Sequence, residues 1–134
     1  MTSTSTTPIN PDEKRSGWVP TAELLVGCIA ALILLNLVMI AAGLAGVDPS
    51  PDIDVIPFIA ATAALGAAAL PMVRAGQRLG YWLAIGLGLL SMVGMGPHKL
   101  FLEDGGIIAP VAIVGFTAEI ALIWAATRHL RVPS

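Results

Sequence analysis

The chain has 134 residues, of which 56% are hydrophobic and only 12% are charged. Soluble domains carry about 25% charged residues, so this composition leaves too little polar surface for a water-soluble globule. The formal net charge is −2, and the Lys and Arg residues stand near the ends of apolar blocks, which excludes a phosphate-tracking surface and argues against a nucleic-acid partner. The single cysteine, Cys28, excludes an internal disulfide or a cysteine-based zinc cluster, and we expect it to pack as a small apolar residue.

The first segment, residues 1–17, is polar and rich in Ser, Thr and Pro. Such a segment cannot bury enough apolar surface to offset its ordering entropy, so we expect a disordered tail. It does not resemble a signal peptide, because Lys14 and Arg15 come late and the apolar block after them is too long.

Four apolar blocks follow the tail, at residues 18–45, 55–73, 79–96 and 107–127. A membrane-spanning helix needs about 20 apolar residues to cross about 30 Å of hydrocarbon. Buried strands are shorter, and four segments cannot close a barrel, so only helices satisfy their backbone in lipid. The sequence therefore predicts an all-α integral membrane four-helix bundle over residues 18–128, followed by a short C-terminus at 129–134.

The distribution of positive charge predicts the orientation of this bundle. With four spans, the N-terminal tail, the second loop and the C-terminus share one side of the membrane. That side holds Lys14, Arg15, Arg74, Arg78, Arg128 and Arg131. The other side holds only Lys99, so the positive-inside rule places both termini in the cytoplasm of a plasma-membrane protein. The aromatic residues expected at the same interface are Trp18, Tyr81, Trp82 and Trp124.

Small residues at helical spacing predict where the helices approach one another. The third block carries Gly80, Ala84 and Gly88 on one stripe. The second block carries a stripe of Ala60, Ala64 and Ala68. Lipid gives helices no hydrophobic reason to associate, so close backbone approach at small residues stabilises their packing. These stripes serve either the bundle itself or a larger membrane partner.

Glu119 is the residue that stands out, because its carboxyl lies well inside the fourth apolar block. An ionised carboxylate facing lipid there costs about 2.5 kcal/mol or more, so we expect its side chain to face the bundle interior. A functional interpretation makes it a proton or cation site, or an anchor for a ligand. A structural interpretation makes it a neutral carboxyl that is hydrogen-bonded within the bundle or to a partner.

Other polar residues are predicted at similar depth and form, with Glu119, a sparse polar layer. They are Asn36, Thr62, Ser91 and Thr117. An Asn in such a helix commonly bridges two helices, which is the expected structural role of Asn36. Ser91 and Thr62 can instead bond the carbonyl four residues earlier in their own helices.

The outer loops hold a weaker candidate cation site. Its residues are His98, Glu103, Asp104, Asp52 and Asp54. One His among scattered acids lacks the spacing of a metal site, so a solvated loop explains them as well, and no metal or cofactor is predicted. The two histidines, His98 and His129, fall on opposite sides of the predicted membrane and cannot share an active site. This argues against an enzyme.

The sequence favours a non-enzymatic subunit or scaffold of a membrane complex, with the bilayer and other membrane subunits, or a second copy, as partners. A first alternative is a small proton- or cation-coupled transporter that uses Glu119. A second is a protein that binds a quinone-like or lipid-like ligand, which requires a pocket beside Glu119 large enough for a ring. No motif in the sequence assigns a family.

Overall fold

The computed structural model describes residues 19–47, 51–94 and 105–131, and this part of the chain is almost entirely helical. The elements in chain order are α2 (Val19–Ala45), the 3-10 turn η1 (Ile53–Val55), α3 (Ile56–Arg74), α4 (Arg78–Gly94) and α5 (Gly105–Arg131). The four α-helices confirm the four predicted helical blocks. The main difference is α5, which continues past residue 127 to Arg131. The predicted polar tail lies outside the described residues.

Three of the described helical segments are long and apolar enough to cross a membrane. They are Ala22–Ala45, Ile53–Arg74 and Pro110–Arg131. The remaining helix, α4, is apolar but has only 17 residues. At about 1.5 Å per residue it is about 25 Å long, against about 30 Å for the hydrocarbon core of a bilayer. The third predicted span is therefore the shortest helix, as its block in the sequence indicates.

Two glycines end helices by adopting a left-handed backbone. Gly46 follows α2 with φ +62°, and Gly76 follows α3 with φ +69°. At the second site the N–H of Gln77 donates to the carbonyl oxygen of Met72 at 2.9 Å, which closes the last turn of α3. Glycine adopts this conformation without the steric cost that a Cβ would add. The chain therefore reverses within a few residues and starts α4 beside α3.

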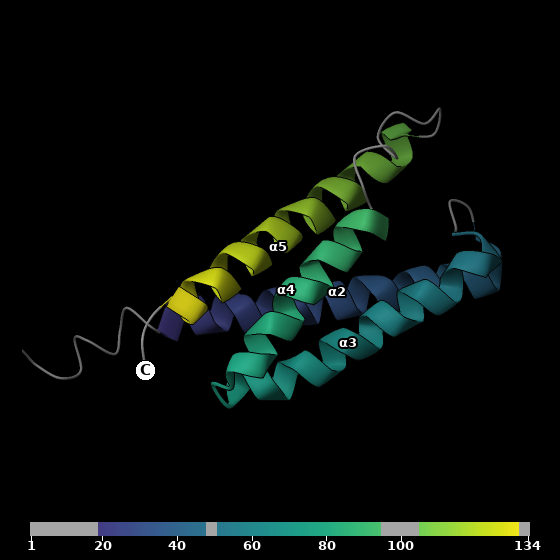
Figure 1. Cartoon of the computed structure of the whole chain (residues 1–134). Helices are drawn as coiled ribbons and strands as arrows, with labels where there is room; N and C mark the ends of the chain where they lie inside the picture. The colour runs from purple at the N-terminus through teal and green to yellow at the C-terminus, as the bar shows by residue number, and fades with distance from the viewer. Residues whose placement is uncertain (1–18, 48–50, 95–104, 132–134) are drawn as a thin grey trace, which may run out of the picture.

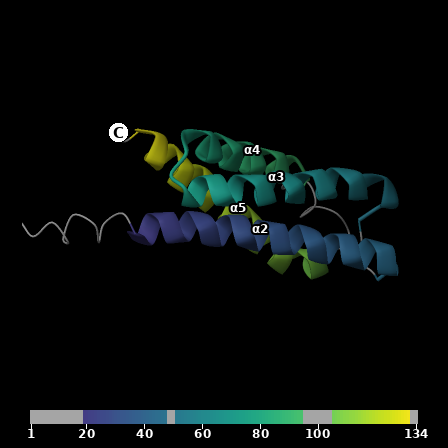
Figure 2. The same cartoon turned by 90° about the horizontal axis from the view of Figure 1, so that it is seen from below.

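The helices pack in a closed ring. Each helix contacts the next one in the chain, and α5 returns to contact α2. In Figure 1, α5 is inclined relative to α2 and α3. In the same view α4 lies between α5 and α3 and overlaps α2. Seen from below in Figure 2, α2, α3 and α4 extend along one direction, and α5 crosses them obliquely. The described part of the chain is thus a four-helix bundle with chain neighbours side by side.

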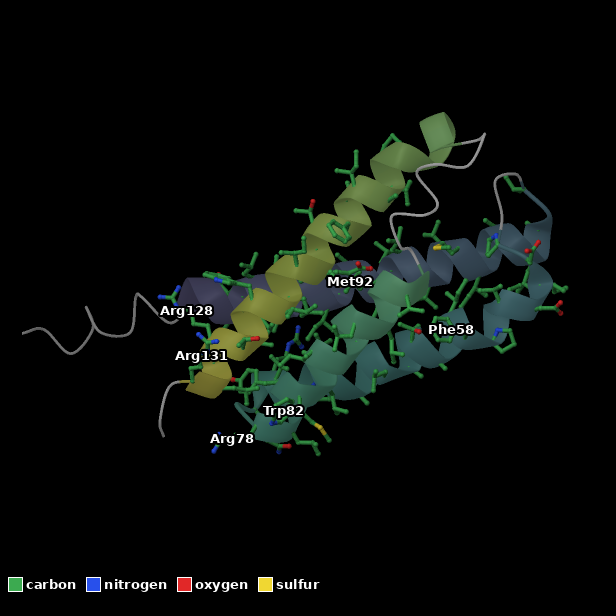
Figure 3. All side chains as sticks on the ribbon, turned by 45° about the horizontal axis from the view of Figure 1, so that its top comes forward. Phe58, Arg78, Trp82, Met92, Arg128 and Arg131 are labelled. Carbon is green, nitrogen blue, oxygen red and sulfur yellow. The ribbon has the colours of Figure 1, made fainter. Side chains whose placement is uncertain are left out.

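Exposed charges lie at the two ends of the bundle. Figure 3 shows Arg78, Arg128 and Arg131 gathered at one end. We call this the basic end, and its exposed arginines are Arg74, Arg78, Arg128 and Arg131. The opposite end, which we call the acidic end, carries the exposed Asp52 and Asp54 just before α3. This separation of charge is the one that the sequence pattern predicts.

Between the two ends, large apolar side chains cover the outer surface. Leu34 of α2 is 63% exposed, Val93 of α4 is 73% exposed and Val114 of α5 is 66% exposed. Soluble monomers rarely expose a contiguous apolar patch larger than a few hundred Å². Apolar side chains exposed on helices around the ring are characteristic of a protein surrounded by lipid.

The apolar core fills the half of the bundle nearest the basic end. Its buried members are Leu25, Cys28, Ile29, Leu32, Val73, Tyr81, Ala84, Leu87, Leu122, Ala125 and Ala126. Three large side chains, Leu25, Leu87 and Leu122, are fully buried there. Cys28 is a free, buried thiol among them, which confirms its predicted role as a small apolar residue.

Glycines of α4 allow two close helix contacts. A Cβ at Gly80 would lie 2.6 Å from the backbone nitrogen of Val73, so the turn between α3 and α4 leaves no room for a side chain. A Cβ at Gly88 would lie 2.8 Å from Cγ1 of Ile123 in α5. Together with the buried Ala84, these residues place the small-residue stripe of α4 on its buried face.

The small-residue stripe predicted for α3 lies elsewhere. Ala60, Ala64 and Ala68 are all exposed, so this stripe is not the packing face of α3 within the chain. The buried face of α3 consists of Ile59, Thr62, Ala63, Gly66, Ala69 and Val73. Alanine is so frequent in α3 that several stripes look alike in sequence. The large partners decide the face, because Gly66 packs against Ile33 and Leu87.

The last turn of α5 also differs from the sequence prediction. The sequence pattern places His129 in a short C-terminus that follows the bundle. Instead its ring stacks on Tyr81 of α4, with ring centroids 4.9 Å apart and planes 3° apart. Leu130 packs against the apolar core beside it. The contacts of His129 and Leu130 stabilise this last turn of α5, which ends at Arg131.

We predict opposite effects for two glycine substitutions in α4. Gly80→Ala places its Cβ 2.6 Å from backbone atoms and should lower the free energy of unfolding by about 1–3 kcal/mol. Gly86→Ala meets nothing within 4 Å and should raise stability by up to about 1 kcal/mol, because alanine favours the helix. Thermal unfolding in detergent micelles measures both. Equal effects of the two substitutions would contradict the close contact of α3 and α4.

Candidate functional site

Each of the four α-helices contributes one buried polar side chain to the same region. Asn36 comes from α2, Thr62 from α3, Ser91 from α4 and Glu119 from α5. Glu119 is completely buried, and the other three side chains are at most 8% exposed. All four line a single cavity. The structure therefore brings together four of the five residues that the sequence predicts as a polar layer.

The cavity is small and has mainly apolar walls. Its volume is about 30 Å³. The walls between the polar groups are formed by Leu32, Leu35, Met39, Val55, Phe58, Ile59 and Gly94. A cavity needs roughly 10–15 Å³ to hold one water-sized species, so this one holds roughly two. A small ion or a water molecule fits in this cavity, whereas an organic ligand that contains a ring does not.

Most polar atoms of the cavity have no hydrogen-bond partner within the described part of the chain. The exception is Thr62, whose Oγ1 donates to the carbonyl oxygen of Phe58 at 2.9 Å. The atoms without a partner are Nδ2 of Asn36, Oγ of Ser91 and both carboxyl oxygens of Glu119. Burying such an atom unpaired costs about 1–3 kcal/mol, and native structures contain few of them. A cluster of them on one cavity is typical of a binding site.

Within residues 19–47, 51–94 and 105–131, Glu119 is the only ionisable residue that lines the cavity. On its own helix the first arginine toward the basic end is Arg128, nine residues or about 13 Å further along. The guanidinium of Arg128 lies over the ring of Trp124, 5.4 Å from the ring centroid, and so is directed at the bundle surface. No arginine of the described part of the chain lines the cavity to compensate the charge of an ionised Glu119.

The cavity occupies the half of the bundle nearest the acidic end. Val55 and Phe58, which line it, belong to the start of α3, and Gly94 is the last residue of α4. On the other side of Glu119 begins the apolar core, with Leu122 in the next turn of α5. The two halves of the bundle thus differ: one is densely packed and apolar, and the other contains the polar cavity.

The remaining predicted site residues do not join this cavity. Thr117 is exposed, and its Oγ1 donates to the carbonyl oxygen of Ile113 at 2.7 Å. Asp52 and Asp54 are exposed at the acidic end. The other predicted loop ligands, which are His98, Glu103 and Asp104, lie outside the described residues. Among the residues that the structure does describe, no three His, Cys, Asp or Glu side chains are grouped as a metal site would require.

Sequence reasoning missed the residues that make room for the cavity. Gly94 has no side chain, and a Cβ there would lie 3.4 Å from Cε1 of Phe58, so glycine leaves space at the end of α4. Met39 and Phe58 are ordinary apolar residues in the sequence, and nothing in their pattern marks them as cavity walls. The only available signal was the depth of the four polar residues along their helices.

In comparisons with known proteins, this chain matches no family model, no curated protein and no solved structure. Function therefore has to be argued from the chemistry of the cavity itself, since a four-helix bundle supports many unrelated functions.

We predict that Glu119→Met does not destabilise the protein. Methionine has a similar length and removes two buried oxygens that lack partners, so the free energy of unfolding should rise by about 1 kcal/mol or stay unchanged. The measurement is thermal unfolding in detergent, in a choline-based buffer that contains no small metal cation. Ile120→Met, at an exposed neighbouring position, is the control and should change stability by less than about 0.5 kcal/mol. A clear loss of stability in Glu119→Met alone would show that the carboxyl is a structural hydrogen-bonding group.

Proposed function

We propose that this protein is a small multi-pass membrane protein that moves a proton or a small cation, with Glu119 as the binding carboxyl. The observation that supports this proposal is the convergence of one polar side chain from every helix on a cavity around a fully buried carboxyl. Buried acids near the middle of a membrane protein mark ion pathways and proton relays. Sites shared by all helices of a bundle also respond when the helices move relative to one another.

The cavity volume favours this function over binding of a ring-shaped ligand. Pockets for drug-sized ligands measure about 300–1,000 Å³. The cavity beside Glu119 measures about 30 Å³, which suits an ion or water. A quinone-like or lipid-like ligand would require the helices to separate widely.

The second candidate is a non-enzymatic subunit of a membrane complex. It is favoured by the exposed face of α3, where Ala60, Ala64 and Ala68 form a flat stripe. Flat faces of small residues let a neighbouring helix approach closely in lipid. The two candidates are compatible, because a proton or cation site can also belong to one subunit of an assembly. They differ in whether the isolated protein transports anything.

We place the basic end of the bundle on the cytoplasmic side of the plasma membrane. The support is the grouping of Arg74, Arg78, Arg128 and Arg131 at that end, together with the positive-inside rule. Single cysteines at Arg131 and at Asp54, in a Cys28→Ala background, test this orientation. A membrane-impermeant maleimide added to intact cells should label the cysteine at position 54 and spare the one at position 131. The opposite result would invert the orientation.

Reconstituted transport tests the proposed function. In proteoliposomes with a pH gradient or a sodium gradient, the wild-type protein should give a flux that Glu119→Gln reduces at least tenfold, because an amide cannot exchange a proton. Thr117→Val is the matched control: this residue lies on the same helix, is exposed, and bonds only to its own backbone. Its flux should equal that of the wild type.

Two outcomes would contradict the proposal that the protein is a transporter. Flux that is unchanged in Glu119→Gln would remove the carboxyl from the pathway. An absence of flux in every protein, combined with a partner that stays bound through purification in mild detergent, would favour the subunit instead.

A further inference from the structure

The cavity presents more hydrogen-bonding capacity than the chain itself satisfies. Both carboxyl oxygens of Glu119, the hydroxyl of Ser91 and the amide nitrogen of Asn36 have no partner among the described residues. The nitrogen and oxygen of an Asn amide exchange places by a half-turn, so Asn36 can present its oxygen to the cavity instead. The hydroxyl oxygen of Thr62 donates its proton to Phe58 and keeps its lone pairs. The four side chains therefore offer several oxygen atoms that can coordinate a cation in one small cavity.

The charge of these four side chains determines which charge a bound ligand can carry. Of the residues that the structure describes, only one ionisable group lines the cavity, and it is an acid. An ionised Glu119 would be an unpaired charge among apolar walls, which is strongly unfavourable. One proton or one monovalent cation makes the site neutral. A divalent cation would leave a net positive charge in the same place, so the site favours single charges.

The chemistry and the size of the site further limit which cation it can bind. Carboxylate, amide and hydroxyl oxygens prefer hard cations, and none of the described residues that line the cavity carries an imidazole or a thiol to attract a transition metal. The volume of about 30 Å³ accepts a dehydrated small cation with roughly one water, and excludes an organic cation. Among common hard monovalent cations, Na⁺ is smaller than K⁺ and needs fewer oxygen ligands, so four side chains and one water suit Na⁺ better.

The packing of the bundle determines from which end the ion arrives. Toward the basic end the cavity meets the apolar core, where Leu87 and Leu122 are fully buried and Leu32 is 3% exposed. Toward the acidic end it is bordered by Val55 and Phe58, which are 38% and 39% exposed. A cation cannot cross closely packed leucines, whereas the partly exposed border lies next to the acidic end. Access from the acidic end is therefore the shorter path.

We propose that Na⁺ and a proton compete for the site formed by Glu119, Asn36, Thr62 and Ser91, and that both enter from the acidic end. This inference rests on the proposed function, because it specifies the ion that the same carboxyl binds. It adds three properties to it: the ligand is monovalent, the neutral side chains coordinate it, and in this conformation of the bundle the site is reached from the acidic end.

Competition between Na⁺ and a carbodiimide tests the ligand directly on the wild-type protein. Dicyclohexylcarbodiimide is apolar and modifies a carboxyl only in its protonated form, so bound Na⁺ should protect Glu119. The full chain in detergent is treated in NaCl, KCl or choline chloride at equal ionic strength, and modification of Glu119 is followed by peptide mass spectrometry. Na⁺ should slow the modification at least fivefold relative to choline. Lowering the pH by one unit should raise the half-protecting Na⁺ concentration by up to tenfold.

The outcomes separate this inference from the proposed function. Modification that is fast at low pH but indifferent to Na⁺ would overturn the sodium site and leave a proton site at Glu119. If K⁺ protected Glu119 from modification as well as Na⁺ does, the inference that the size of the site favours Na⁺ would be wrong. If Glu119 is modified at no pH, the carbodiimide does not enter the small cavity, and thermal unfolding of the same protein decides instead. NaCl, against choline chloride at equal ionic strength, should then raise the unfolding temperature of the wild type but not that of Glu119→Met, and equal effects on both proteins would overturn the inference.

Substitutions test the neutral ligands. Asn36→Leu and Ser91→Ala each remove one oxygen donor and should raise the half-protecting Na⁺ concentration roughly tenfold, the effect expected for a lost bond to a charged species. Thr117→Val, which leaves the cavity intact, is the control and should behave as the wild type. Unchanged protection in both cavity variants would overturn their role as ligands. Retained modification of Glu119 at low pH shows that each variant still forms the cavity.

Sidedness is tested in membrane vesicles of known orientation. Na⁺ is added to one side only, and choline replaces it on the other side. Protection of Glu119 is expected when Na⁺ faces the acidic end and is expected to be absent when Na⁺ faces the basic end. Equal protection from both sides, or protection from the basic end alone, would overturn the proposed path.

Discussion

A polar atom inside an apolar bundle must find its hydrogen bonds within the protein, because lipid and apolar side chains offer none. For the backbone this requirement produces the helices themselves, and the four apolar blocks of the chain form them. For side chains it acts on Asn36, Thr62, Ser91 and Glu119, which the ring of helices directs at one another. Thr62 meets the requirement through its own helix. The other three do not meet it among the described residues, and this unsatisfied capacity is the basis of the proposed ion site.

The two halves of the bundle interior have different roles. Near the basic end, large side chains such as Leu25 and Leu122 are fully buried and hold the helices together. Glycines of α4 bring the helices close enough for this packing. Near the acidic end, packing is interrupted by the cavity. Functional sites often lower stability because they keep polar groups without partners, and the rest of the structure must compensate. The dense half compensates for the cavity, and it also closes the cavity on one side.

The exposed surface adds a constraint of a different kind. Large apolar side chains cover it between two charged ends, so the surface matches lipid rather than water. The short length of α4 fits this arrangement less well than the lengths of the other three helices. A helix shorter than the hydrocarbon thickness is accommodated by local thinning of the bilayer or by flanking polar side chains that reach to the interface, each at a modest energetic cost. The alanine face of α3 is the part of this surface that suits close contact with another helix.

The sequence by itself determined the number of helices, their approximate bounds and the separation of basic and acidic ends. These depend on block length and on charge placement, which are local properties of the chain. It also identified Glu119 and its three neutral companions, since depth along a helix follows from counting residues. Only the tertiary structure decided that Thr117 faces outward, that α3 packs through Gly66 rather than through Ala60, Ala64 and Ala68, and that His129 stacks on Tyr81. Each of these depends on the rotation of one helix against its neighbours. That rotation is set by the contacts of large side chains across the bundle, which no single segment of the sequence contains.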